Sequence, residues 1–138
     1  MREKREVSSF VPYRHSEGAL GFYLQMRDKD AKTNPNVFGL FGGGMEEGET
    51  PHDALMREIG EELEYSPKNA RYFCRYELAR VVMHVFIEEV DPRFEAKVIV
   101  HEGEYGTFLS LDEVVSSGLV NKGAKLVVQE IARYLDSR

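Results

Sequence analysis

Three glutamates at positions 58, 61 and 62 have the types and spacing for metal chemistry. On an α-helix, residues three and four positions apart share one face, so Glu58, Glu61 and Glu62 would gather in one patch. Each like-charge pair at that spacing costs a helix about 0.2–0.5 kcal/mol, and the negative end of the helix dipole adds to the cost. A bound cation would offset both, and clustered carboxylates suit Mg²⁺ or Mn²⁺ rather than zinc. The alternative is a solvated acidic face in a chain with 30% charged residues.

A glycine-rich stretch precedes these glutamates at a fixed spacing. The pattern resembles the Nudix box, G-x5-E-x7-R-E-U-x-E-E-x-G-U, in which U is a bulky aliphatic residue. The positions that match in type and spacing are Gly43, Glu49, Arg57, Glu58, Ile59, Glu61 and Glu62. The last two positions depart, because Glu64 replaces the glycine and Tyr65 the aliphatic residue. A glycine there often adopts a left-handed helix cap, so the departure concerns how the helix ends and leaves the metal ligands unchanged.

The resemblance implies an α/β fold, a Nudix-type α/β/α sandwich with a mixed central β-sheet. It also implies hydrolysis of a nucleoside diphosphate linked to another group, X, with Mg²⁺ or Mn²⁺ as cofactor. In the family, the residue that matches Gly43 offers a carbonyl to the metal. The residues that match Glu49 and Arg57 form an ion pair that braces the loop against the helix.

A second acidic cluster, HEGEYGTF, supplies the remaining candidate ligand. Many family members carry a metal-site glutamate four residues before an aromatic residue here. Glu104 precedes Phe108 by four residues and is the first choice, with Glu102 second and an ordinary polar loop as the alternative. The implied metal ligands are Gly43, Glu58, Glu61, Glu62 and Glu104. The implied catalytic carboxylates are Glu58, Glu61 and Glu104, and the choice of general base among them stays open.

The elements that must position these residues are also readable. Thr50 and Pro51 predict the start of a helix, as an N-cap and a first-turn proline. Leu55, Ile59 and Leu63 recur every four residues and predict its buried stripe. The apolar run 37–41 predicts a short strand that leads into the glycine loop.

The rest of the chain predicts further strands and a final helix. Residues 5–14 read as a strand, which Pro12 should confine to a sheet edge or a bulge. Residues 97–101 read as another strand, and a helix over 122–135 should bury Leu126 together with Val127, Ile131 and Leu135. The order of elements fits a mixed sheet between helices.

Two residues are weaker candidates for substrate contact. Arg27 ends the strand-like run 19–27 and could meet phosphate, or it is a solvated strand-end arginine. Phe10 could stack on a base, as could Tyr13, or both aromatic rings belong to the core.

Composition narrows the class of protein. The chain of 138 residues predicts one domain, 1–138, with a proper core. A net charge of −6 argues against nucleic acid or a membrane surface as the main partner. The partner that the resemblance implies is a small nucleotide. The charged start MREKREVSSF is no secretory signal, and the lone cysteine, Cys74, fits a reducing cytoplasm. A homodimer is left open.

The identity of X is less constrained. Nucleoside and deoxynucleoside triphosphates are favoured because the domain is minimal, and nucleotide sugars and dinucleoside polyphosphates are the alternatives. A non-catalytic, nucleotide-sensing module of the same family is a further alternative. Such a module would be expected to lose glutamates of the box, which are all present here.

Overall fold

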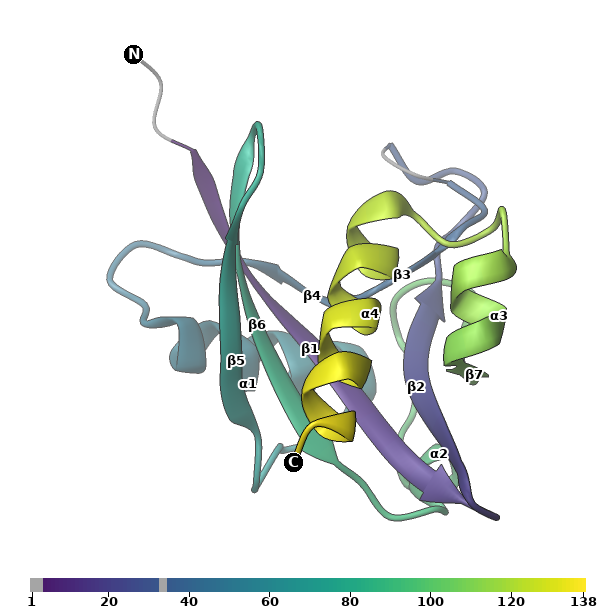
Figure 1. Ribbon diagram of the computed structural model, residues 1–138. Coiled ribbons are helices and arrows are strands. Elements are labelled where there is room, and N and C mark those ends of the chain that lie inside the picture. Colours follow the sequence, from purple (N-terminus) through teal and green to yellow (C-terminus); the bar gives the residue numbers. More distant parts are fainter. Residues whose placement is uncertain (1–3, 33–34) are drawn as a thin grey trace.

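The computed structural model describes residues 4–32 and 35–138. Its strands and helices follow one another in a mixed order, with four strands before the first helix (Figure 1). In chain order they are β1 (Arg5–Ser16), β2 (Ala19–Met26), β3 (Phe38–Gly39), β4 (Phe41–Gly44), α1 (Pro51–Leu63), β5 (Arg71–Glu77), β6 (Val81–Glu89), α2 (Phe94–Lys97), β7 (Tyr105–Ser110), α3 (Leu111–Ser116) and α4 (Lys122–Asp136). No described helix is long and apolar enough to cross a membrane.

The central sheet is mixed and has seven strands, with β3-β2-β1-β6-β5 as its main path. Strand β7 pairs with β2, and β4 pairs with β1. Strands β1 and β6 run parallel, and the other paired strands are antiparallel. This arrangement confirms the predicted mixed sheet and places the glycine-rich strand β4 directly beside β1.

Helices cover both faces of the sheet (Figure 1). On one face, α1 packs its buried stripe against a cluster of aromatic side chains that includes Phe10, Phe41 and Phe86. On the other face, α3 and α4 pack against aliphatic side chains of β1, β2 and β6. The result is the predicted α/β/α sandwich, with two apolar layers that hold the sheet between helices.

Pro12 lies in the central strand β1, so its predicted place at an edge or a bulge is wrong. The antiparallel pairing of β1 with β4 ends at Phe10, and its pairing with β2 begins at Tyr13. Pro12 therefore occupies the point where β1 changes partner on that side. A missing N–H removes no rung from either ladder at this position.

Two further expectations need correction. Leu126 is 44% exposed, whereas Val127 and Ile131 are fully buried, because the apolar stripe of α4 runs one position away from Leu126. The predicted strand 97–101 is absent. Its residues leave α2 and run along the end of α1, where the Ile99 N–H donates to the Leu63 carbonyl at 3.0 Å.

Candidate metal and active site

Helix α1 begins and packs in a way that fixes its orientation. The Thr50 side chain accepts a hydrogen bond from the Asp53 N–H, and the Asp53 carboxylate accepts one from the Thr50 N–H, which makes a capping box. Leu55, Ile59 and Leu63 are fully buried against the sheet. With that stripe locked, the adjacent arc of the helix faces strand β4.

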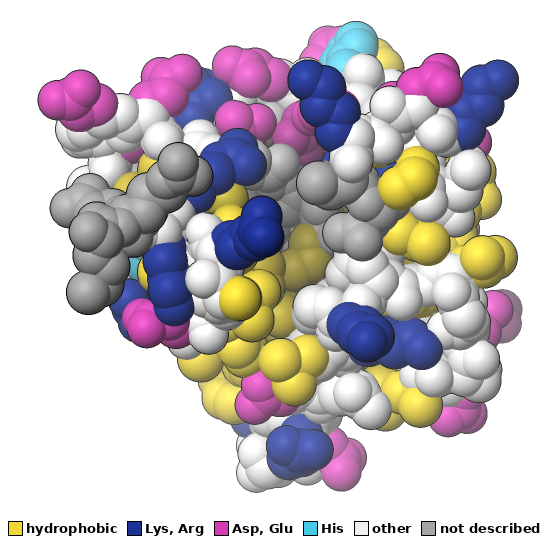
Figure 2. Space-filling view, turned by 90° about the horizontal axis from the view of Figure 1, so that it is seen from above, with side chains coloured by type: hydrophobic (Ala, Val, Ile, Leu, Met, Phe, Trp, Pro, Cys, Tyr) yellow, Lys and Arg dark blue, Asp and Glu magenta, His cyan; other side chains and the backbone are white. Residues whose placement is uncertain are grey.

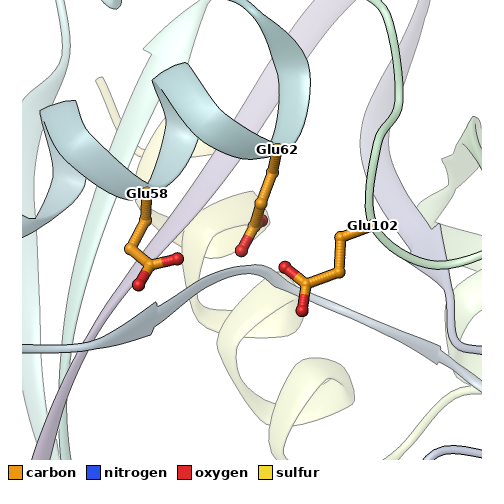
Figure 3. Close-up of side chains that lie close together, drawn as sticks. All are labelled: Glu58, Glu62 and Glu102. Carbon is orange, nitrogen blue, oxygen red and sulfur yellow. The ribbon is translucent and has the colours of Figure 1, made fainter.

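Three carboxylates from two parts of the chain meet beside β4. Glu58 and Glu62 come from α1, and Glu102 comes from the segment between α2 and β7 (Figure 3). One carboxylate oxygen from each lies within 4.8 Å of the others. Glu62 is 2% exposed, Glu58 is half-buried and Glu102 is exposed, so the cluster opens toward solvent on the Glu102 side.

The cluster is electrostatically unfavourable without a counter-ion. Burial raises the pKa of the Glu62 carboxyl, and the neighbouring Glu102 and Glu58 carboxylates raise it further. The Gly42 N–H donates to Glu62 Oε1 at 3.1 Å and acts in the opposite direction. A divalent cation would favour the ionised form of all three groups, and an all-oxygen donor set suits Mg²⁺ or Mn²⁺.

The glycines of β4 let the main chain approach these carboxylates. A Cβ atom on Gly43 would lie 2.5 Å from the Cδ atom of Glu58. A Cβ atom on Gly42 would lie 2.1 Å from the Ser8 carbonyl oxygen, and Gly42 has a φ of +137°. Glycine is therefore required on steric grounds at Gly42, where main-chain atoms leave no room, whereas a side chain at Gly43 would push the Glu58 carboxylate out of its place. Two observations make the site suitable for a divalent cation: the main chain of β4 lies close to the carboxylates, and the three candidate ligands all offer oxygen atoms.

Arg57 ties the loop after β4 to the helix. Its Nε and Nη2 atoms donate to the two carboxylate oxygens of Glu49 at 2.8 and 2.9 Å, so the predicted ion pair is present. Nη2 also donates to the Gly44 carbonyl at 3.0 Å, and Nη1 to Glu58 Oε1 at 2.9 Å. The hydrogen bond from Arg57 lowers the pKa of Glu49 to about 2.

The third carboxylate of the cluster comes from Glu102, whereas the sequence favoured Glu104. Glu102 joins the cluster and Glu104 does not. The Glu104 N–H donates to the Met26 carbonyl at 2.9 Å, which begins the pairing of the chain with β2. Spacing from Phe108 could not reveal this, because it says nothing about how the chain runs before β7.

Other predicted site residues lie apart from the cluster. The Glu61 side chain is 62% exposed, and its carboxylate lies 3.9 Å from Nη1 of Arg57. Phe10 is fully buried in the aromatic layer beneath α1, so it is a core residue, and its assignment to base stacking is wrong. A metal-binding carbonyl at Gly43 stays a prediction.

A large groove opens at the end of the molecule near the first turn of α4. Its volume is about 730 Å³, and Arg27, Leu40, Leu78, Lys122 and Lys125 are among its lining residues. Seen from this end, Lys and Arg side chains lie on both sides of a hollow with hydrophobic side chains on its floor (Figure 2). Leu40 is two residues before Gly42, whose N–H contacts Glu62, so the groove and the carboxylates share one stretch of main chain.

Arg27 connects the groove with the carboxylate cluster. It lines the groove and also a smaller cavity of about 220 Å³, whose lining includes Lys32 and Glu102. Of the two weaker candidates for substrate contact, Arg27 is therefore the one that lies in a suitable place. Sequence reasoning missed Gln25, which lines the same small cavity and carries no motif.

Comparisons with known proteins agree with this geometry. A search among curated proteins found no significant match. The chain resembles a mutT/nudix family protein from Listeria innocua, with a TM-score of 0.78, 15% identity, and 99% and 98% of the two chains covered. It also resembles the NUDIX domain of Shewanella oneidensis NrtR, solved with ADP ribose (TM-score 0.76, 16% identity, 97% and 90% covered).

A third similar structure is the Ap4A hydrolase of C. elegans, with a TM-score of 0.66, 16% identity, and 96% and 99% of the two chains covered. At these identities, the likeness to solved structures establishes a shared fold. The family model of the NUDIX domain matches residues 4–130, which include the glycine loop, α1 and Glu102. The chain therefore belongs to the Nudix family.

Proposed function

We propose that this protein is a Mg²⁺-dependent hydrolase of phosphoanhydride bonds in nucleotides, in which a nucleoside diphosphate is linked to a further group. The preferred substrates are nucleoside or deoxynucleoside triphosphates, which are cleaved to a monophosphate and pyrophosphate. The observation that carries the proposal is the cluster of Glu58, Glu62 and Glu102, whose carboxylate oxygens lie within 4.8 Å of one another. Membership of the Nudix family supports a hydrolase.

The three carboxylates share one metal in this proposal, and Glu58 has a second task. Glu58, Glu62 and Glu102 would hold Mg²⁺ or Mn²⁺, which when bound polarises phosphoryl oxygens and lowers the pKa of water. Arg57 Nη1 donates to Glu58 Oε1 at 2.9 Å and orients this carboxylate, which could also accept a proton from the attacking water. Glu61 is the other predicted base on α1, and its exposed carboxylate is not one of the three in the cluster.

The two hollows beside the cluster support a triphosphate. The groove of about 730 Å³ has an apolar floor and room for a nucleoside. The cavity of about 220 Å³ has two basic and two acidic side chains in its lining, Arg27 and Lys32 with Asp28 and Glu102, and so suits phosphate groups that carry a metal ion. Arg27 borders both, so a nucleotide could lie with its base in the groove and its phosphates beside the carboxylates.

Nucleotide sugars and dinucleoside polyphosphates are the alternative substrates, because the structures of similar fold include one bound to ADP ribose and one Ap4A hydrolase. A nucleotide-sensing module without activity is the alternative from another class. A location in the cytoplasm and a homodimer stay predictions.

A substrate panel with Mg²⁺ tests the proposal. Nucleoside triphosphates, nucleotide sugars, ADP-ribose and dinucleoside polyphosphates are incubated with wild type and with Glu62→Gln, and products are separated by ion exchange. Glu89→Gln is the matched control, because Glu89 is exposed at the end of β6. We expect triphosphate turnover in wild type and in the control, and its loss in Glu62→Gln. Nucleotide binding without turnover of any substrate would favour the sensing module.

A further inference from the structure

Gln25 is a buried polar residue beside the carboxylate cluster. It lies on β2 and is 4% exposed. Its Nε2 atom donates a hydrogen bond to the main-chain carbonyl of Glu102 at 2.8 Å. A buried side-chain amide is costly to desolvate, and this hydrogen bond offsets part of that cost.

The segment that carries Glu102 is docked closely onto this amide. Gly103 has a φ of +83°, and a Cβ atom on it would lie 2.7 Å from the Met26 carbonyl oxygen and 2.8 Å from Cγ of Gln25. The Glu104 N–H donates to the same Met26 carbonyl at 2.9 Å. The two residues that follow Glu102 therefore have little room to shift.

On its other side, the segment is attached to the end of α1. The His101 N–H donates to the Glu62 carbonyl at 2.8 Å. The residue before Glu102 is therefore bound to the main chain of Glu62. The Glu102 side chain itself is exposed, and packing does little to fix it. Its place in the cluster must come from the main chain that carries it.

We propose that Gln25 is a positioning residue for the metal site, which holds the main chain of Glu102 so that its carboxylate meets Glu58 and Glu62. The inference rests on the proposed function. Groups that orient metal ligands typically contribute 10–100-fold to metal affinity or activity. Gln25 acts through a main-chain carbonyl, so we expect the lower end of that range.

The test compares Gln25→Met with Gln129→Met. Methionine keeps the length of glutamine and removes both its donor and its acceptor, and Gln129 is exposed on α4. Mn²⁺ binding is followed by calorimetry and by electron paramagnetic resonance at a temperature where circular dichroism shows both variants folded. We expect Mn²⁺ to bind about tenfold more weakly to Gln25→Met and with wild-type affinity to Gln129→Met. Saturating Mn²⁺ should restore most of the kcat lost in Gln25→Met.

Wild-type Mn²⁺ affinity in folded Gln25→Met would overturn the inference. If that variant does not fold, Gly103→Ala tests the same contact from the loop side, and unchanged Mn²⁺ affinity there would overturn it equally. Glu62→Gln separates the two proposals. Mn²⁺ binding that is insensitive to Glu62→Gln would contradict the proposed metal site, whereas sensitivity to Glu62 without sensitivity to Gln25 would contradict only the positioning role.

Discussion

Among single residues, Glu62 faces the strongest opposing demands. Its carboxyl is buried beneath β4 and lies near two other carboxylates, both of which disfavour its charge. Its hydrogen bond from the Gly42 N–H and the proposed metal both favour the charge. The pKa of Glu62 in the metal-free protein is therefore raised above its ordinary value of 4.5.

This raised pKa predicts a pH dependence of stability. The folded metal-free protein binds the Glu62 proton more tightly than the unfolded chain does. The resulting stabilisation is fully present below pH 4.5 and is lost as the pH rises toward the raised pKa. From about pH 5 upward, the thermal midpoint of the metal-free protein should fall, and saturating Mg²⁺ should reduce that slope.

Glu62→Gln isolates the contribution of this group. The amide stays neutral at every pH, so the metal-free variant should lose most of the slope and exceed wild type in stability at alkaline pH. Thermal scans at matched ionic strength measure both effects. An equal slope in wild type and Glu62→Gln would assign the pH dependence to other groups.

At the scale of elements, helix α1 and the loop before it form one unit through Arg57. The guanidinium reaches Glu49, Gly44 and Glu58 at once, and its planar fork is what allows two parallel bonds to Glu49. The loop that carries the glycines is thereby attached to the helix that carries the carboxylates.

Arg57→Lys should therefore damage the site even though it keeps the charge. A lysine cannot make the forked contact, and misplacement of the loop by about 1 Å can cost on the order of 10²-fold in rate. Steady-state kinetics at saturating Mg²⁺ measures the loss. The exposed Arg71 of β5 offers Arg71→Lys as the matched control, and equal rates in the two variants would show that the fork is dispensable.

The end of α1 supplies a second prediction about an element. Glu64 adopts the left-handed conformation, with φ 49° and ψ 45°, in the place where the Nudix box has glycine. Its carboxylate is hydrogen-bonded to the His101 ring on the segment that carries Glu102. Glu64 thus keeps the left-handed helix end that glycine often forms in the Nudix box, and it adds a contact to the segment that carries Glu102.

Glycine at position 64 should relieve the cost of this conformation, which is about 1 kcal/mol for a non-glycine residue. Glu64→Ala loses the His101 contact to the same extent and keeps the left-handed conformation. We therefore expect Glu64→Gly to be more stable than Glu64→Ala by about 1 kcal/mol in urea unfolding. Equal stability would mean that α1 ends differently in solution.

Local patterns explain which elements could be predicted. Helix α1 and its cap involve residues close in sequence, so local spacing predicted them. The Glu49–Arg57 ion pair was implied by the resemblance to the Nudix box. The central place of Pro12 depends on β1 changing partner between β4 and β2, which no local pattern encodes. Glu102 joins the cluster because its segment is fixed by Gln25 and by the end of α1, both distant in sequence.

Across the whole molecule, charge is distributed unevenly. The net charge of −6 disfavours a polyphosphate anion. Basic side chains nevertheless lie beside the hollow at one end, while acidic side chains gather along one edge of the same view (Figure 2). Arg27, Lys122 and Lys125 line the groove, and the carboxylates form the neighbouring cation site. A nucleotide with its metal would meet complementary charge at both places.

A comparison of Glu102→Gln with Glu104→Gln tests whether the carboxylate cluster is the metal site. The two residues lie two positions apart, and only Glu102 lies within the carboxylate cluster. Mn²⁺ affinity and Mg²⁺-dependent triphosphate turnover are measured for both variants and for wild type. We expect Glu102→Gln to lose at least tenfold in Mn²⁺ affinity and in turnover, and Glu104→Gln to stay within a few-fold of wild type. The reverse order would contradict a metal site built from Glu58, Glu62 and Glu102.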